Sequence, residues 1–156
     1  MATSTFNMIV GREGRTLRDK WQQEGTKTFL GLHSEGFPNL FIVSGPQGGG
    51  GSFNFTNAIE EHGDYVVWML STMRDKGADV VDVKSEPEEE YAAHCRQADQ
   101  LTRPLRDCIT YYNGHGEAEP GSLAYYGGGN WHKYRTRAQQ TLDPYEFESR
   151  SQIVDR

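Results

Sequence analysis

The order of apolar and polar positions divides the first half of the chain into a strand, a glycine-rich loop and a helix. Residues 40–43 form a short continuous apolar run, which is typical of a strand buried on both faces. A Gly-Pro pair ends that run, and four consecutive glycines follow at 48–51. Apolar residues then recur at helical spacing, at Phe55, Ile59, Val66, Leu70 and Met73. The pattern predicts a helix over 55–76 that ends at Gly77.

The remaining pattern predicts shorter elements around this unit. We expect strands at 7–10, 28–32 and 80–83, a helical turn at 16–21, and helices at 86–102 and 130–141. The charged residues of the helical turn and the acidic run that opens the second helix are expected to face solvent, because such side chains are rarely buried. His62 lies near the apolar stripe and is expected to be a core histidine with its ring hydrogen-bonded. The fold class is therefore α/β or α+β.

Composition narrows the class of protein. The 156 residues are 35% hydrophobic with a mean hydropathy of −0.75, which is low for a self-contained core. A net charge of −6 argues against general nucleic-acid binding. No apolar run approaches the roughly 20 residues of a membrane span, and the first residues lack a secretory signal. Cys95 and Cys108 lack metal-ligand spacing, so we expect a reduced, cytoplasmic setting.

Three interpretations of the glycine loop are open. A phosphate-binding P-loop has the right glycine spacing from Gly45, but Gly51 stands where the lysine is required. A flexible linker has this composition, yet the flanking strand and helix argue against one. A turn facing a cofactor is the third, because a helix amino end presents free N–H groups and a positive dipole to an anion or an electron-rich edge.

The order of several motifs resembles a known family. The motifs are Gly31-Leu32, GFPNLF at 36–41, Gly45-Pro46, Asn54 and IEEH at 59–62, with GREGRTLRDKW at 11–21 upstream and aromatic segments at 110–114 and 123–128 downstream. Together they are similar to the C-terminal part of flavin-dependent Baeyer–Villiger monooxygenases. The resemblance covers about residues 6 to 148 and implies a C-terminal fragment of a flavoprotein with two dinucleotide-binding domains.

The resemblance implies an activity that this chain does not carry alone. Members of the family use FAD and NADPH to insert one oxygen atom of O₂ beside a ketone carbonyl, giving an ester or lactone. Their two dinucleotide fingerprints and their catalytic arginine lie upstream of the resembling region, and this chain has no counterpart of them. No independent catalytic motif or metal-ligand set is present. We therefore expect a ketone substrate, bulky and cyclic, and an upstream flavoprotein half as partner.

The resemblance also assigns candidate site residues. Those expected near the flavin are Gly45, Pro46, Asn54 and Phe55. Those expected near the ketone are Ser52, Phe53, Tyr111 and Tyr112. The loop at 115–122 departs from the family by losing a lysine and gaining acids, which argues against an NADPH contact there. No catalytic residue is assigned to this chain.

The expected organisation has three parts. Residues 1–78 form the end of an FAD-binding domain, 79–148 a helical and aromatic segment, and 149–156 a disordered tail. The interleaved tyrosines and tryptophans after residue 105 either line a substrate pocket or form a satellite core. The alternatives to an enzyme part are a non-enzymatic binding or docking module with an aromatic pocket, an inactive remnant, and a chain without a stable fold.

Overall fold

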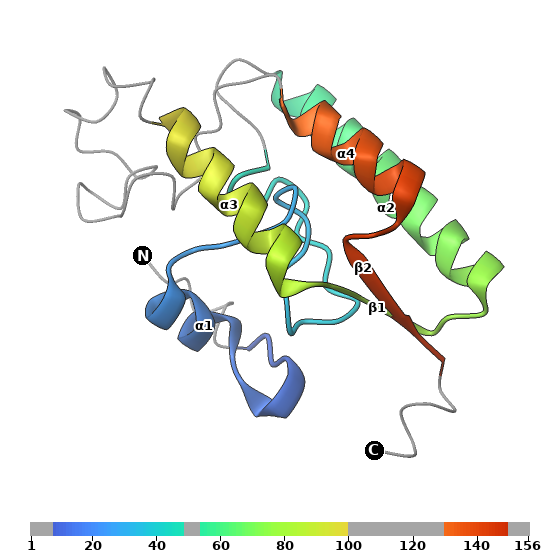
Figure 1. Cartoon of the computed structure of the whole chain (residues 1–156), viewed down its shortest axis with the longest axis horizontal. Helices are drawn as coiled ribbons and strands as arrows, with labels where there is room; N and C mark the ends of the chain where they lie inside the picture. The colour runs from blue at the N-terminus through green and yellow to red at the C-terminus, as the bar shows by residue number, and fades with distance from the viewer. Residues whose placement is uncertain (1–7, 49–53, 100–129, 150–156) are drawn as a thin grey trace.

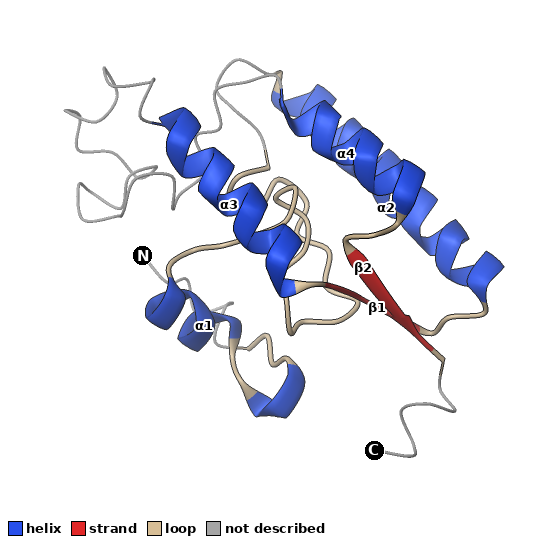
Figure 2. Cartoon of the chain, in the orientation of Figure 1, coloured by secondary structure: helices blue, strands red, loops and turns tan. Residues whose placement is uncertain are grey.

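Helices and loops make up most of the chain, and a short two-stranded sheet joins its middle to its end (Figures 1 and 2). The computed structural model describes residues 8–48, 54–99 and 130–149. Within them the elements are the 3-10 turn η2 (Arg12–Gly14), α1 (Leu17–Glu24), α2 (Phe55–Lys76), β1 (Val80–Val83), α3 (Ser85–Asp99), α4 (Asn130–Thr141) and β2 (Tyr145–Glu148). The mixture of helix and strand confirms the expected fold class.

The helices follow signals that lie close by in the sequence. The side chain of Asn54 accepts a hydrogen bond from the Thr56 N–H at the start of α2, and Gly77 ends that helix at a φ of 63°. Both ends of α2 are those predicted, as are both ends of α4. Helix α1 extends the predicted turn, and the Thr16 side chain caps it by accepting from the Asp19 N–H. Helix α3 begins one residue earlier than predicted.

Strand β1 was predicted, but its partner β2 was not. The two strands are antiparallel, with Val81 opposite Phe147 and Val83 opposite Tyr145. Figure 2 shows the pair beneath the end of α4, which leads into β2 through a short turn. The sheet therefore ties the segment after α2 to the segment after α4.

Three other predicted strands are wrong over the residues described. Residues 28–32 form a tight turn in which Phe29 and His33 pair, because Leu30 and Gly31 both have positive φ, 59° and 69°. Residues 40–43 run between left-handed residues at Asn39 and Ser44, so the run bends at both ends. Among the described residues, its only backbone–backbone bond beyond neighbouring turns is from the Ile42 N–H to the Leu32 carbonyl, which is too little for a strand ladder. Residues 8–10 contribute an isolated bridge at Val10.

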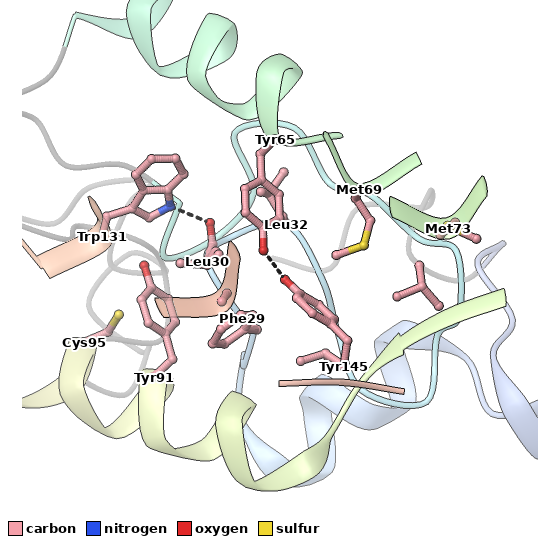
Figure 3. Packing of buried hydrophobic residues seen from close by; sticks show 13 residues of the cluster. Phe29, Leu30, Leu32, Tyr65, Met69, Met73, Tyr91, Cys95, Trp131 and Tyr145 are labelled. Atoms are coloured by element: carbon pink, nitrogen blue, oxygen red, sulfur yellow. Dashed lines mark hydrogen bonds between the residues drawn. The ribbon is translucent and has the colours of Figure 1, made fainter. Parts of the chain in front are cut away.

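Among the described residues, one apolar core lies where the turn at 29–33 meets α2, α3, α4 and the sheet. Its buried members are Phe29, Leu30, Leu32, Tyr65, Met69, Met73, Val81, Val83, Tyr91, Cys95, Trp131, Ala138 and Tyr145. Figure 3 shows two hydrogen bonds inside it: the Trp131 indole N–H donates to the Leu30 carbonyl at 3.0 Å, and the Tyr65 and Tyr145 hydroxyls are 2.6 Å apart. Trp131 therefore belongs to the main core of this chain, which is neither the substrate pocket nor the satellite core expected for the aromatic residues after 105. Burial also raises the pKa of the Cys95 thiol to about 12, so the thiol stays protonated at neutral pH.

The buried face of α2 differs from the predicted stripe. His62, Tyr65, Met69 and Met73 are buried on this helix, and of the five predicted residues only Met73 is among them. Phe55, Ile59 and Leu70 are exposed, at 67%, 39% and 52%. The helix is thus apolar on a face wider than its contact with the core.

Two charged residues that were expected in solvent are buried. Lys20 of α1 and Glu88 of α3 are each 1% exposed and lie 2.8 Å apart. The prediction failed because these two groups neutralise each other across two helices, a pairing that no local pattern announces. Within the described ranges, no helix is both long and apolar enough to cross a lipid bilayer.

Candidate functional site

The glycine turn at 45–48 is closed by the chain's own backbone. A Cβ added to Gly31 would lie 2.0 Å from the Cα of Gly48, and one added to Gly45 would lie 2.5 Å from the Gly31 carbonyl oxygen. These distances are too short for any side chain, so the turn at 28–33 and the turn at 45–48 touch because both carry glycine. Gly31, Gly45 and Gly48 thus serve an internal contact, and the space that a side chain would need at each of them is filled.

The polar backbone atoms of Gly45 and Pro46 are also occupied. The Gly45 N–H donates to the Ile42 carbonyl at 3.2 Å, and the Gly45 carbonyl accepts from the Gly48 N–H at 3.0 Å. The Pro46 carbonyl accepts from the Thr28 hydroxyl at 2.7 Å. Proline has no N–H of its own. Neither residue therefore has a free donor to offer a cofactor, although the ring of half-buried Pro46 remains accessible.

His62 fastens this turn to α2 with both of its ring nitrogens. Its Nδ1 accepts from the Ser44 N–H at 3.0 Å, so the proton sits on Nε2, which donates to the Gly48 carbonyl at 2.9 Å. The ring is 1% exposed, and burial lowers its pKa although the bond to Gly48 opposes that shift. The expectation of a hydrogen-bonded core histidine is confirmed. The neutral ring sets where the turn lies relative to the start of α2.

The first turn of α2 is the part of the predicted site that stays open. Asn54 and Phe55 are exposed, and N–H groups of a first helical turn lack partners within the helix. Asn54 caps one of them, that of Thr56, at 3.0 Å. The positive end of the helix dipole lies at the same place. Donors at this end can therefore meet a negatively charged or electron-rich group.

Hollows among the described residues do not enclose a large ligand at this end. A space of about 20 Å³, lined by Gly48, His62 and Trp131 among others, has room for a water molecule. A larger hollow of about 340 Å³ lies between α3 and α4 and is lined by charged groups that include Lys84, Glu90 and Arg137. It shares no residue with the predicted site. Among the described residues, the predicted site is an exposed helix end.

Two residues that hold the turn were not found by sequence reasoning. Gln47 is 1% exposed, and its side chain accepts from the Thr28 N–H at 3.0 Å and donates to the Thr26 carbonyl at 3.2 Å. The Tyr91 hydroxyl of α3 donates to the Gln47 carbonyl at 2.7 Å. No spacing in the sequence indicates these contacts. The predicted substrate residues Ser52, Phe53, Tyr111 and Tyr112 lie outside the described residues.

Comparison with curated proteins relates the chain to one family of enzymes. The chain is 30% identical over 124 residues to the Baeyer-Villiger monooxygenase peniC of Penicillium patulum, and 33% identical over 140 residues to a Baeyer-Villiger monooxygenase of Streptomyces coelicolor. The first match takes in 76% of this chain and the second 86%. The chain is homologous to one region of the Baeyer–Villiger monooxygenases. No family model matches it.

Solved Baeyer–Villiger structures contain the same fold. A steroid monooxygenase bound to NADP superposes with a TM-score of 0.73 at 26% identity over 90% of this chain. The polycyclic ketone monooxygenase of Thermothelomyces thermophila gives a TM-score of 0.75 at 27% identity, also over 90%. The chain spans 26% and 24% of these two structures, and 20% and 23% of the two relatives above. It thus corresponds to about a quarter of a Baeyer–Villiger monooxygenase or less.

Proposed function

We propose that this chain is the part of an FAD- and NADPH-dependent Baeyer–Villiger monooxygenase that presents the amino end of α2 to the flavin. The enzyme acts on a bulky cyclic ketone and forms an ester or lactone. The observation that supports this most directly is the exposed first turn of α2, fastened through His62 to a buried turn. The homology described above supports the reaction class.

The residues present fit contacts to one side of a flavin ring, and they do not form a complete FAD site. The N–H groups at the start of α2 would hold the electron-rich edge of the ring, and the Pro46 ring would border it. FAD, once reduced by NADPH, supplies the oxygen-transfer chemistry when it is bound. This chain would orient the cofactor, while His62 would keep the turn and the helix at a constant distance. Most of the FAD and NADPH contacts would come from other polypeptide, the upstream half.

A fusion tests the proposal. We would join this chain to the polycyclic ketone monooxygenase of Thermothelomyces thermophila in place of the region that it resembles. The fusion is expected to bind FAD and to oxidise NADPH when a cyclic ketone is added, with an ester detected by mass spectrometry. The isolated chain is expected to bind no FAD in a calorimetric titration.

Two substitutions of Phe55 separate the role of its N–H from that of its side chain. Phe55 is the first residue of α2, where proline is well tolerated, and Asn54 already has the extended backbone that a following proline requires. Phe55→Pro removes one N–H and keeps the helix, whereas Phe55→Ala keeps the N–H. We expect the proline variant of the fusion to bind reduced FAD about tenfold more weakly than the alanine variant, since a hydrogen bond to a charged group contributes about 1.5 kcal/mol.

Each result has a clear meaning. Equal FAD affinity of the two Phe55 variants would show that this helix end does not face the flavin. A chain that binds apolar ligands without flavin, and a fusion without ketone-dependent NADPH oxidation, would support the non-enzymatic binding module instead.

A further inference from the structure

One side of α2 carries an apolar row that no described residue covers. Its exposed members are Phe55 (67%), Ile59 (39%), Val67 (64%) and Leu70 (52%). At 100° per residue, Ile59, Val67 and Leu70 fall within one quarter of the helix circumference, about 80° or more from the buried Tyr65 and Met69. Phe55 lies at the edge of this row, on the side of the buried Met73. Soluble proteins rarely leave such a row open unless another surface meets it.

A glycine lies in the middle of this row. Gly63 falls between Ile59 and Val67 on the same side of the helix, and a Cβ added to it would meet nothing within 4 Å. Glycine inside a helix costs about 1 kcal/mol relative to alanine, so an open glycine here weakens α2 without an internal benefit. By contrast, Gly31 and Gly48 allow their two turns to touch each other. A flat notch between aliphatic side chains is the shape that lets another backbone approach a helix closely.

We propose that this face of α2, the row Phe55, Ile59, Val67 and Leu70 with the notch at Gly63, is the docking surface for the remaining flavoprotein body. The occupant is a segment of that body that places its backbone or a small side chain against Gly63, with aliphatic groups on either side. The inference rests on the proposed function, in that it names the surface by which the chain joins its partner.

The length of the relatives and the small area of the apolar row both favour the flavoprotein body over a second copy of this chain as the occupant. The chain corresponds to 20% and 23% of the length of its two relatives, so most of their polypeptide has no counterpart here. The row spans about 24 Å along one helix side and so offers a few hundred Å². A stable dimer buries roughly 800 Å² on each partner. The row is thus too small for a dimer by itself and fits one contact of a larger interface.

Helix α4 leaves this face open. It runs alongside α2 in Figure 1, and Arg135 of α4 pairs with Glu61 of α2. Glu61 lies on the side of α2 away from Gly63, because two residues along a helix differ by about 200°. The docking surface and the α4 contact therefore occupy different sides of the same helix.

The test uses one substitution with opposite effects on folding and on docking. Gly63→Ala places a methyl group in open space, so the isolated chain should unfold at higher urea concentration than the wild type. The same methyl group blocks a close backbone approach, and Gly63→Leu blocks it more. Asp64→Leu is the matched control, because Asp64 is exposed on the neighbouring side of the helix.

Binding is measured by calorimetry between this chain and the Thermothelomyces thermophila enzyme lacking the matching region. We expect wild type and Asp64→Leu to bind equally, Gly63→Ala more weakly, and Gly63→Leu weaker by about tenfold or more. These binding measurements do not depend on enzymatic turnover. A negative result here can therefore be distinguished from a negative result in the FAD and ketone assays of the fusion.

Four results would overturn the inference. The first is no binding by the wild-type chain, and the second is equal binding by all variants. The third is a Gly63→Ala chain that unfolds at lower urea concentration, which would mean that another part of this chain covers the face. The fourth is a wild-type chain that forms a dimer in light scattering and becomes monomeric with Gly63→Leu, which would make the face a self-contact.

Discussion

Two buried histidines show how one residue type meets different demands. The ring of His62 uses both nitrogens and holds two loop positions, whereas the ring of His33 is bonded to the Leu40 backbone and leaves its Nε2 without a partner among the described residues. His33 packs edge-on against Phe41, Tyr65 and Tyr145. Desolvation in this aromatic surrounding lowers its pKa from 6.5 to about 3. The folded chain therefore keeps His33 neutral.

The neutral His33 makes stability depend on pH. The unfolded chain takes up a proton at this ring below about pH 6.5, while the folded chain does so only near its lowered pKa. The contribution of His33 to the free energy of unfolding is complete above the pKa of the unfolded chain. As the pH falls below that value, this contribution is lost by about 1.4 kcal/mol per pH unit. Urea unfolding at pH 7 and pH 5 should show a loss of about 2 kcal/mol from this group.

His33→Phe isolates the effect. The variant keeps the aromatic packing and removes the titrating ring, so its stability should change less between the two pH values than that of the wild type, by the same 2 kcal/mol or so. Identical pH profiles for the two proteins would show that His33 is not the source.

At the scale of elements, helices α1 and α3 are joined by one buried ion pair. The Lys20 ammonium donates to Glu88 Oε2 at 2.8 Å and to the Glu35 carbonyl at 2.7 Å. Glu88 Oε1 accepts from the Ser34 hydroxyl at 3.1 Å and from the Glu35 N–H at 2.9 Å. Burial is the largest influence on the Glu88 carboxyl and raises its pKa, although Lys20 and these donors oppose the shift. One carboxylate thus fixes two helices and the loop at 34–35.

A double-mutant cycle tests this pair. Glu88→Gln keeps one oxygen for Ser34 and Glu35 but turns an N–H group toward Lys20. The buried ammonium is then left with only the half-exposed Glu35 carboxylate, at 3.2 Å. We expect a loss of about 3 kcal/mol in urea unfolding. Adding Lys20→Met should recover most of that loss, because an apolar residue no longer needs the charge. Additive losses in the double variant would contradict a coupled pair.

At the scale of the whole molecule, Tyr145 joins segments that are distant in the chain. It starts β2, its hydroxyl meets that of Tyr65 from 80 residues away, and its ring lies 5.8 Å from that of Phe29 and 5.2 Å from that of His33. The turn at 29–33, helix α2 and the sheet converge on this one side chain. The core therefore depends on the pairing of β2 with β1, which brings Tyr145 into it.

We therefore expect Tyr145 to be a sensitive position for global stability. Tyr145→Ala should cost about 3–5 kcal/mol, since it removes a buried aromatic ring. Tyr145→Phe should cost only about 1 kcal/mol, the net value of the hydroxyl pair. Urea unfolding followed by circular dichroism gives both values. Phe147→Ala, on the partly buried end of the same strand, serves as control, and a loss there as large as for Tyr145→Ala would argue against a central role.

The candidate site was predictable where its chemistry is local. Asn54 and Phe55 lie at a helix start that capping signals in the sequence mark, and the structure leaves that start exposed. The role of the glycines was predictable only in part. The sequence places glycines at 45 and 48, but it does not indicate that the neighbouring group is the backbone at Gly31. Gln47 and Tyr91 hold the turn through contacts that no pattern of neighbours indicates.

By itself the sequence determined the helices and the family. Capping at Asn54 and Gly77 involves groups within a few residues, so α2 has the predicted ends. Only the tertiary structure decided the strands and the buried charges. A strand needs a partner, and β1 pairs with β2, more than sixty residues later. Residues 40–43 pair with no strand in the part of the chain that the structure describes. Lys20 is buried because Glu88, 68 positions away, neutralises it. Local groups set the helix ends, whereas the strands and the buried charges needed partners that folding brings together.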